Sequence, residues 1–184
     1  MTIRLPDNIK KLVDAHPDAY ELLKDIALAL AIVAVVATVL FLYAGEWPPI
    51  VSVDGTSMLD HMHQGDLVLV QGLDRTTVNT YRASTETGYQ AYGDYGDVIV
   101  YSPYGNTSYD MVIHRAMYWV NESEPLWPLG PPAPWSGYMT MGDNNGGRLD
   151  QDTDICRNQP VKPEWVHGVA KFSVPYIGYL RSLI

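Results

Sequence analysis

The sequence predicts a mostly β fold, with a single N-terminal transmembrane helix followed by an antiparallel β-sheet domain. Residues 26–44 contain no charge, proline or glycine, and the run is long enough to cross the ~30 Å hydrocarbon core of a bilayer. After residue 45 the apolar residues alternate with polar ones or form short runs between turn residues, which is typical of β-strands. We therefore divide the chain into residues 1–25, 26–44 and 45–184.

Residues 6–25 precede the apolar run and are expected to be helical as well. Their apolar residues recur on one face of a helix, and Pro6 and Pro17 each stand where a first helical turn tolerates proline. We expect these residues to form a short cytoplasmic lead-in to the transmembrane helix.

A cleaved secretory signal is the alternative to a retained helix at residues 26–44. Such signals carry an apolar stretch of only ~7–15 residues, a basic start and a small-x-small cleavage site. Here the stretch is longer, five acidic residues precede it, and the exit from Leu42 to Glu46 is a poor cleavage site. The sequence therefore favours an anchor that stays in the membrane.

The basic residues around the anchor indicate its orientation. Those before it are Arg4, Lys10, Lys11 and Lys24, and the next one after it is Arg75. Because basic flanks stay on the cytoplasmic side, we expect the N-terminus in the cytoplasm and residues 45–184 on the outer side of the cell membrane. N-glycosylation patterns begin at Asn106 and Asn121 on that side, and the sequence leaves open whether either is used.

The overall charge limits the partners. The 184 residues include 12 Lys and Arg against 21 Asp and Glu, which gives a net charge of -9. A nucleic-acid-binding protein needs a basic surface to displace counterions, so no nucleic-acid partner is expected. Cys156 is the single cysteine, so the chain can form neither an intrachain disulfide nor a Cys-rich zinc site.

The outer portion alternates between short strands and turns. Six strands are expected, at residues 50–53, 66–71, 97–101, 111–120, 137–141 and 166–174. Residues 72–96 and 121–136 are expected to be surface loops, because the first is polar and the second holds five prolines. Trp127 and Trp135 in the second loop suit either a bilayer surface or packing on the sheet.

The first candidate for chemistry is Ser57, in a turn of small residues between two expected strands. Such a turn can present a nucleophilic hydroxyl, although Gly-Thr-Ser is also ordinary turn composition. A serine nucleophile needs a base, and the only outer lysines, Lys162 and Lys171, come late in the chain. His114, in a β-patterned run, is the candidate base; the alternative is a half-buried strand histidine with a structural hydrogen bond.

No metal or other cofactor is expected. His61 and His63 form an H-x-H pair, but no third ligand stands at a suitable spacing. Asp150, Asp152 and Asp154 imitate the start of a calcium-binding loop, but the loop lacks the glycine and the bidentate glutamate that such a site requires.

Three carboxylates follow the expected strand at residues 137–141. Asp143, Asp150 and Asp152 lie in or near a Gly- and Asn-rich turn at a sheet edge. One of them can accept a hydrogen bond from a base histidine and fix its tautomer. A solvated acidic turn is the alternative interpretation.

Five short motifs follow the anchor in order. They are Ser57-Met58, Gly65-Asp66, Ile113-His114-Arg115, Gly142-Asp143-Asn144-Asn145 and Pro175-Tyr176-Ile177-Gly178-Tyr179. Together they resemble signal peptidase I of the archaeal and endoplasmic-reticulum type, which uses histidine where the usual bacterial type uses lysine. The resemblance covers residues 26–184 and implies Ser57 as the nucleophile and His114 as the general base.

The resemblance also implies an aspartate about six residues after Asp143, which would orient the base. Asp150, one residue further on, is the nearest match, with Asp143 supporting the site and Asp152 as another candidate. Two positions depart from the family pattern: Asp60 replaces a usual proline, and Gly55 replaces a frequent hydroxyl residue of the oxyanion hole. The backbone N–H of Ser57 and the hydroxyl of Thr56 are left for that role.

The resemblance implies a membrane-anchored serine endopeptidase that removes signal peptides from exported preproteins after small-x-small sites. Its expected partners are these preproteins, membrane lipid and the protein-export machinery. Two alternatives stay open: a noncatalytic anchored β domain that binds secreted or envelope proteins, and a related protease that processes other precursors.

Overall fold

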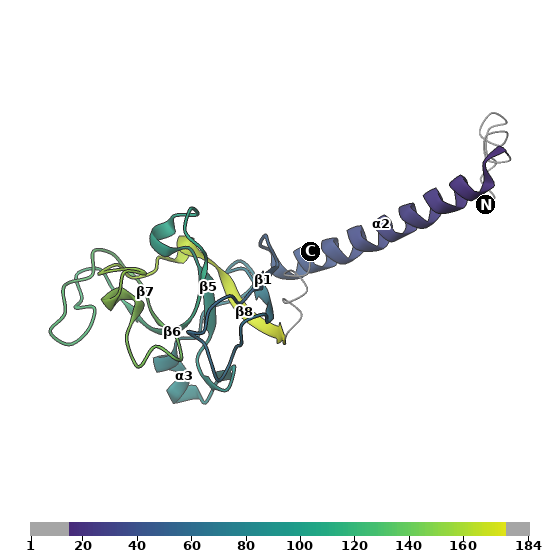
Figure 1. The fold of residues 1–184 in the computed structure, drawn as a ribbon. Helices are drawn as coiled ribbons and strands as arrows, with labels where there is room; N and C mark the ends of the chain where they lie inside the picture. Colours follow the sequence, from purple (N-terminus) through teal and green to yellow (C-terminus); the bar gives the residue numbers. More distant parts are fainter. Residues whose placement is uncertain (1–14, 176–184) are drawn as a thin grey trace. The chain divides into compact units, whose positions relative to one another are not determined.

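The structure, a computed structural model, describes residues 15–175 (Figure 1). The chain divides into two compact units, Met1–Leu42 and Tyr43–Ile184, which are described separately below. Two predictions lie outside the described residues: the helical lead-in before residue 15, and the last motif of the family after Pro175.

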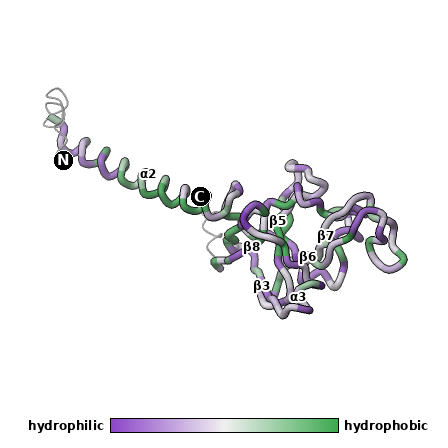
Figure 2. Tube along the Cα trace, turned by 180° about the vertical axis from the view of Figure 1, so that it is seen from behind, coloured by the Kyte–Doolittle hydropathy of each residue, from purple (hydrophilic) through white to green (hydrophobic). Residues whose placement is uncertain are grey.

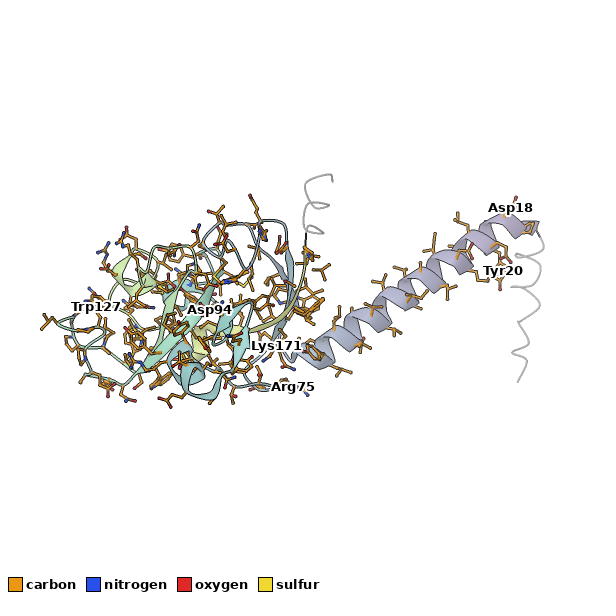
Figure 3. All side chains as sticks on the ribbon, turned by 90° about the horizontal axis from the view of Figure 1, so that it is seen from below. Asp18, Tyr20, Arg75, Asp94, Trp127 and Lys171 are labelled. Carbon is orange, nitrogen blue, oxygen red and sulfur yellow. The ribbon has the colours of Figure 1, made fainter. Side chains whose placement is uncertain are left out.

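Helix α2 spans Pro17–Ala44 and is long and apolar enough to cross a membrane. Its first turns are hydrophilic and the rest is hydrophobic (Figure 2), and side chains project all around it (Figure 3). Thr38, the only polar side chain of the predicted span, donates to the carbonyl oxygen of Ala34 at 2.7 Å, so it needs no water. The helix ends at the predicted Ala44, where Gly45 takes up a left-handed φ of 68° that stops helices.

The second unit contains a six-stranded antiparallel sheet with the strand order β1-β2-β8-β5-β6-β7 (Figure 1). The strands are β1 (Ile50–Ser52), β2 (Leu67–Gln71), β5 (Val98–Tyr101), β6 (Val112–Val120), β7 (Gly137–Met141) and β8 (Val166–Val174). Each coincides with a predicted strand to within one residue at either end. The prediction of an antiparallel β-sheet behind an N-terminal apolar helix is therefore confirmed.

The prediction of a plain loop at residues 72–96 was wrong. This segment forms helix α3 (Tyr81–Thr87) and a hairpin of β3 (Gln90–Ala91) and β4 (Asp94–Tyr95). Thr80 caps α3 by accepting from the N–H of Ala83, and Gly88 ends it with a φ of 78°. Within α3 only Ser84 is buried, so the helix has no apolar stripe by which its period is recognised.

The loop at residues 121–136 packs its two tryptophans on the second unit. Trp127 lies against the buried cluster around Leu126 and Met139. Trp135 meets Trp165 edge to face, with ring centroids 5.6 Å apart, and its indole N–H donates to a backbone carbonyl. Of the two alternatives left open for these rings, the structure shows packing on the domain.

Strand β5 is buried on both faces. Val98 and Val100 join one core cluster, whereas Ile99 and Tyr101 join another on the opposite face, together with Cys156. A central strand covered on both sides requires an unbroken apolar run rather than an alternating one. The candidate site described below lies on the face of the sheet that this second cluster covers.

The Cys156 thiol is predicted to be unreactive in the folded protein. The side chain is fully buried, and burial raises its pKa to about 11, so roughly one thiol in a thousand is ionised at pH 8. A chromogenic disulfide reagent at pH 8 should therefore modify no thiol until denaturant is added, and one equivalent thereafter. Rapid labelling of the native protein would contradict the packing of this core.

Candidate active site

Strand β6 sends two neighbouring polar residues to opposite faces of the sheet. His114 pairs with Ile99 of β5, whereas Arg115 pairs with Val98 of β5 and Met141 of β7. Because successive strand residues alternate, the histidine faces the second core cluster and the arginine faces the first. Each then meets a different carboxylate.

His114 lies between a serine and an aspartate. Its Nε2 is 2.8 Å from Ser57 Oγ, and its Nδ1 is 2.8 Å and 2.9 Å from the two carboxylate oxygens of Asp150. His114 is 3% exposed and Asp150 is 0% exposed. The structure thus brings together the three residues singled out as nucleophile, base and orienting acid.

A one-turn 3-10 helix, η2 (Asp150–Asp152), presents Asp150 to the sheet. Its second residue, Gln151, anchors it to β7 by accepting from the Thr140 N–H at 3.1 Å and donating to the Thr140 hydroxyl at 3.2 Å. The Thr140 hydroxyl donates to the Tyr101 hydroxyl at 3.3 Å, and Tyr101 donates to Asp150 Oδ2 at 2.8 Å. The side-chain donors of Gln151, Thr140 and Tyr101 thus run in succession towards the carboxylate of Asp150.

The contact with the Asp150 carboxylate selects the tautomer of a neutral His114. An ionised carboxylate only accepts hydrogen bonds, so Nδ1 of His114 carries the proton that bonds to Asp150. Nε2 is then a free acceptor facing the Ser57 hydroxyl, which is the arrangement that allows a histidine to deprotonate a serine. Burial, and then the Asp150 charge, raise the pKa of Tyr101 well above its usual range, so Tyr101 stays a donor.

The turn that carries Ser57 joins β1 to β2 and is closed at its base. Val53 and Asp66 are linked by an N–H to carbonyl bond of 2.9 Å, and Gly65 donates to the Val53 carbonyl at 2.8 Å. Asn144 fastens the turn from the other side, with its backbone N–H 2.7 Å from the Ser57 carbonyl and its side-chain amide 3.1 Å from the Thr56 carbonyl. These bonds hold the Ser57 hydroxyl at the histidine.

Asp60 gives the turn that carries Ser57 a backbone that proline cannot adopt. Its φ is 75°, whereas the proline ring holds φ near −65°. Aspartate is among the few residues with a side chain that tolerate this region. The resemblance implied a proline at this position, and the observed backbone excludes one.

Asp143 lies on the opposite face from Asp150 and does not contact His114. Its two oxygens accept from Nε and Nη2 of Arg115 at 2.8 Å and 2.6 Å, and the second also lies 2.7 Å from Nδ1 of His61. Arg115, 1% exposed, also donates to carbonyls of the β3–β4 hairpin, including those of Ala91 and Gly96. Through Arg115 and His61, Asp143 therefore connects the hairpin, β6 and the turn that carries Ser57.

Asp152 is exposed and lies outside the site, with its carboxylate 3.7 Å from the Arg148 guanidinium. Only Asp150 among the three candidate carboxylates contacts the histidine. Within residues 15–175, no group of three His, Cys, Asp or Glu side chains is arranged to hold a metal ion.

An open cleft of about 790 Å³ lies in front of the serine. It is lined by β1, by Ser57 and His114, by residues 110–113 and by Asn145. Strand β1 is at the edge of the sheet, and no strand among residues 15–175 pairs with its outer side. Thr56, the residue expected to assist the oxyanion hole, is exposed and does not line this cleft.

Compared with known proteins, the sequence matches no family model and no curated protein. The interpretation of the site therefore depends on its geometry. Sequence reasoning missed Tyr101, Thr140 and Gln151, which support Asp150. Tyr101 and Thr140 are residue types that strands commonly contain, so the sequence did not mark them. Only Gln151, a polar residue next to Asp150, gave any indication of this network.

Loss of the Asp143 carboxylate is predicted to destabilise the fold. In the Asp143→Ala variant the buried Arg115 guanidinium keeps its charge without its partner, which costs about 3–5 kcal/mol of the free energy of unfolding. Denaturant unfolding followed by tryptophan fluorescence measures this. The exposed Asp152→Ala serves as the control, at about 0.5 kcal/mol or less, and equal effects of the two changes would refute the assignment of Asp143.

Proposed function

We propose that this protein is a membrane-anchored serine endopeptidase of the signal peptidase type, which removes signal peptides from exported preproteins. The hydrogen-bonded chain Asp150–His114–Ser57, buried at the acid and ending in a serine hydroxyl on an open cleft, is the observation that carries the proposal. Three residues from separate parts of the chain have this order and geometry in acyl-transfer enzymes.

In the proposed mechanism Ser57 Oγ attacks the carbonyl carbon of the scissile bond while its proton passes to His114 Nε2. Asp150 stabilises the imidazolium that forms, and the carbonyl oxygen becomes an oxyanion. When the C–N bond breaks, the same proton moves to the departing amine, which leaves an ester on Ser57. A water molecule, deprotonated by His114, then hydrolyses that ester.

The substrate class is proposed from the anchor and the cleft. Ser57 follows the last residue of α2, Ala44, by only 13 residues. A signal peptide spans the membrane by its apolar region and ends in small residues at the outer face, so its protease needs a nucleophile close to a membrane anchor. The free edge of β1 beside the cleft suits an extended peptide, which would pair with it as an added strand.

The positive-inside distribution of lysine and arginine supports an outer location for the catalytic unit. A noncatalytic binding domain explains the anchor equally well, but it gives no reason for a buried His–Asp pair aligned on a serine. A protease for other precursors has the same site, and a panel of substrates with and without small-x-small sites distinguishes it from a signal peptidase.

Ser57→Ala and His114→Ala are each expected to abolish cleavage of a preprotein by the full-length protein in detergent. Each change removes one partner of the 2.8 Å contact through which the nucleophile loses its proton. The assay is the appearance of the mature N-terminus by mass spectrometry. Asp150→Ala should lower turnover far more than the exposed Asp152→Ala. Undiminished cleavage by Ser57→Ala would overturn the proposal.

Tyr101→Phe is expected to move the acid limb of the pH profile of kcat/KM to higher pH. The change removes one donor to Asp150 but keeps the ring, so the carboxylate interacts more strongly with the protonated His114. Turnover should also fall by about 10-fold or more. In Tyr118→Phe, which loses a hydroxyl bond to the Leu126 carbonyl instead, the limb should stay in place. An unmoved limb in Tyr101→Phe would show that Tyr101 only fills space.

A further inference from the structure

The proposed reaction needs a second hydrogen-bond donor that the triad does not supply. A tetrahedral oxyanion is usually held by two preorganised donors, and we expect the backbone N–H of Ser57 to be one of them. The Thr56 side chain is exposed and lies outside the cleft, so it does not provide the other. A donor on the wall of the cleft is required.

Asn145, a residue with a side-chain amide, lines that cleft together with Ser57 and His114. It directly follows Asn144, which is hydrogen-bonded to the turn that carries Ser57. Its backbone N–H donates to the Gly142 carbonyl at 3.0 Å, and its own carbonyl accepts from the N–H of Arg148 at 3.2 Å. The backbone of Asn145 is therefore held in place relative to the serine.

Gly142 allows the Asn145 amide to approach the backbone of Ser57. A Cβ atom at Gly142 would lie 2.7 Å from Asn145 Nδ2 and 2.7 Å from the carbonyl oxygen of Ser57. Both atoms therefore border the small space that the missing side chain leaves open. Any residue larger than glycine would separate the amide from the backbone of the nucleophile.

The Asn145 amide has no hydrogen-bond partner within the part of the chain that the structure describes. The side-chain amide of the neighbouring Asn144 donates to the Thr56 carbonyl. The two adjacent asparagines thus differ: Asn144 holds the turn, whereas Asn145 keeps its N–H groups available beside the cleft.

We propose that the side-chain amide of Asn145 is the second oxyanion donor. The inference rests on the proposed peptidase function. As Ser57 Oγ bonds to the carbonyl carbon, the π electrons of the carbonyl move to its oxygen, and Asn145 Nδ2–H donates a hydrogen bond to that charge. No proton is transferred. Because the charge is absent from the bound substrate, the donor acts chiefly on the transition state.

The test compares Asn145→Ala and Asn145→Asp with the unaltered full-length protein, using one preprotein peptide in detergent. Asn145→Asp keeps the shape and loses the donor. Both variants should lower kcat by about 10²–10³-fold with KM within about threefold, and should weaken binding of a peptide aldehyde, which forms a tetrahedral adduct, by more than tenfold. Asn106→Ala, in an exposed loop outside the cleft, is the matched control.

Each outcome decides the inference. A raised KM with unchanged kcat would show that Asn145 binds the substrate in its ground state, and unchanged kinetics would show that it does nothing; either result overturns the inference while the proposed function stands. A variant that has lost its native circular dichroism also counts against it, because a side chain with no partner should be dispensable for folding. If the unaltered protein cleaves nothing, both proposals fail.

Discussion

The alternation of side chains along β6 is the constraint on which the rest of the site depends. It places His114 on one face of the sheet and Arg115 on the other. One aspartate is therefore available to orient the histidine and a different one to neutralise the arginine. A slip of one residue in the pairing of β6 would exchange the two faces and dismantle both arrangements.

The two faces satisfy their buried polar groups in different ways. On one face, the side chains of Gln151, Thr140 and Tyr101 donate in succession towards Asp150, whose carboxylate lies against Nδ1 of His114. On the other face, the Arg115 guanidinium donates to the Asp143 carboxylate and to several backbone carbonyls. Buried polar groups are costly unless paired, so both networks hold the neighbouring loops in a single arrangement around the serine.

Much of the fold can be predicted from the periodic pattern of apolar residues along the chain. Segments without such a pattern could not be predicted in this way. The six strands of the sheet alternate or form short apolar runs, and they were predicted to within one residue at either end. Helix α3 has two turns and no apolar face, so no periodic pattern marked it. Ser57 and His114 were candidates from their residue types and surroundings, whereas Asp150 was chosen among three carboxylates only through the resemblance to a known family. Strand register brings Tyr101 to Asp150, and a turn brings Asn145 to the cleft; one sequence reveals neither placement.

The central claim is that Ser57 forms a covalent acyl-enzyme with the signal peptide. Rapid quenching of the full-length protein with a preprotein, followed by mass spectrometry, tests this most directly. We predict a transient mass increase, equal to the signal peptide less one water, on the fragment containing Ser57. This adduct forms as the mature protein is released and decays as the free signal peptide accumulates. Accumulation of mature protein in the Ser57→Ala variant, or an adduct on another residue, would contradict the account.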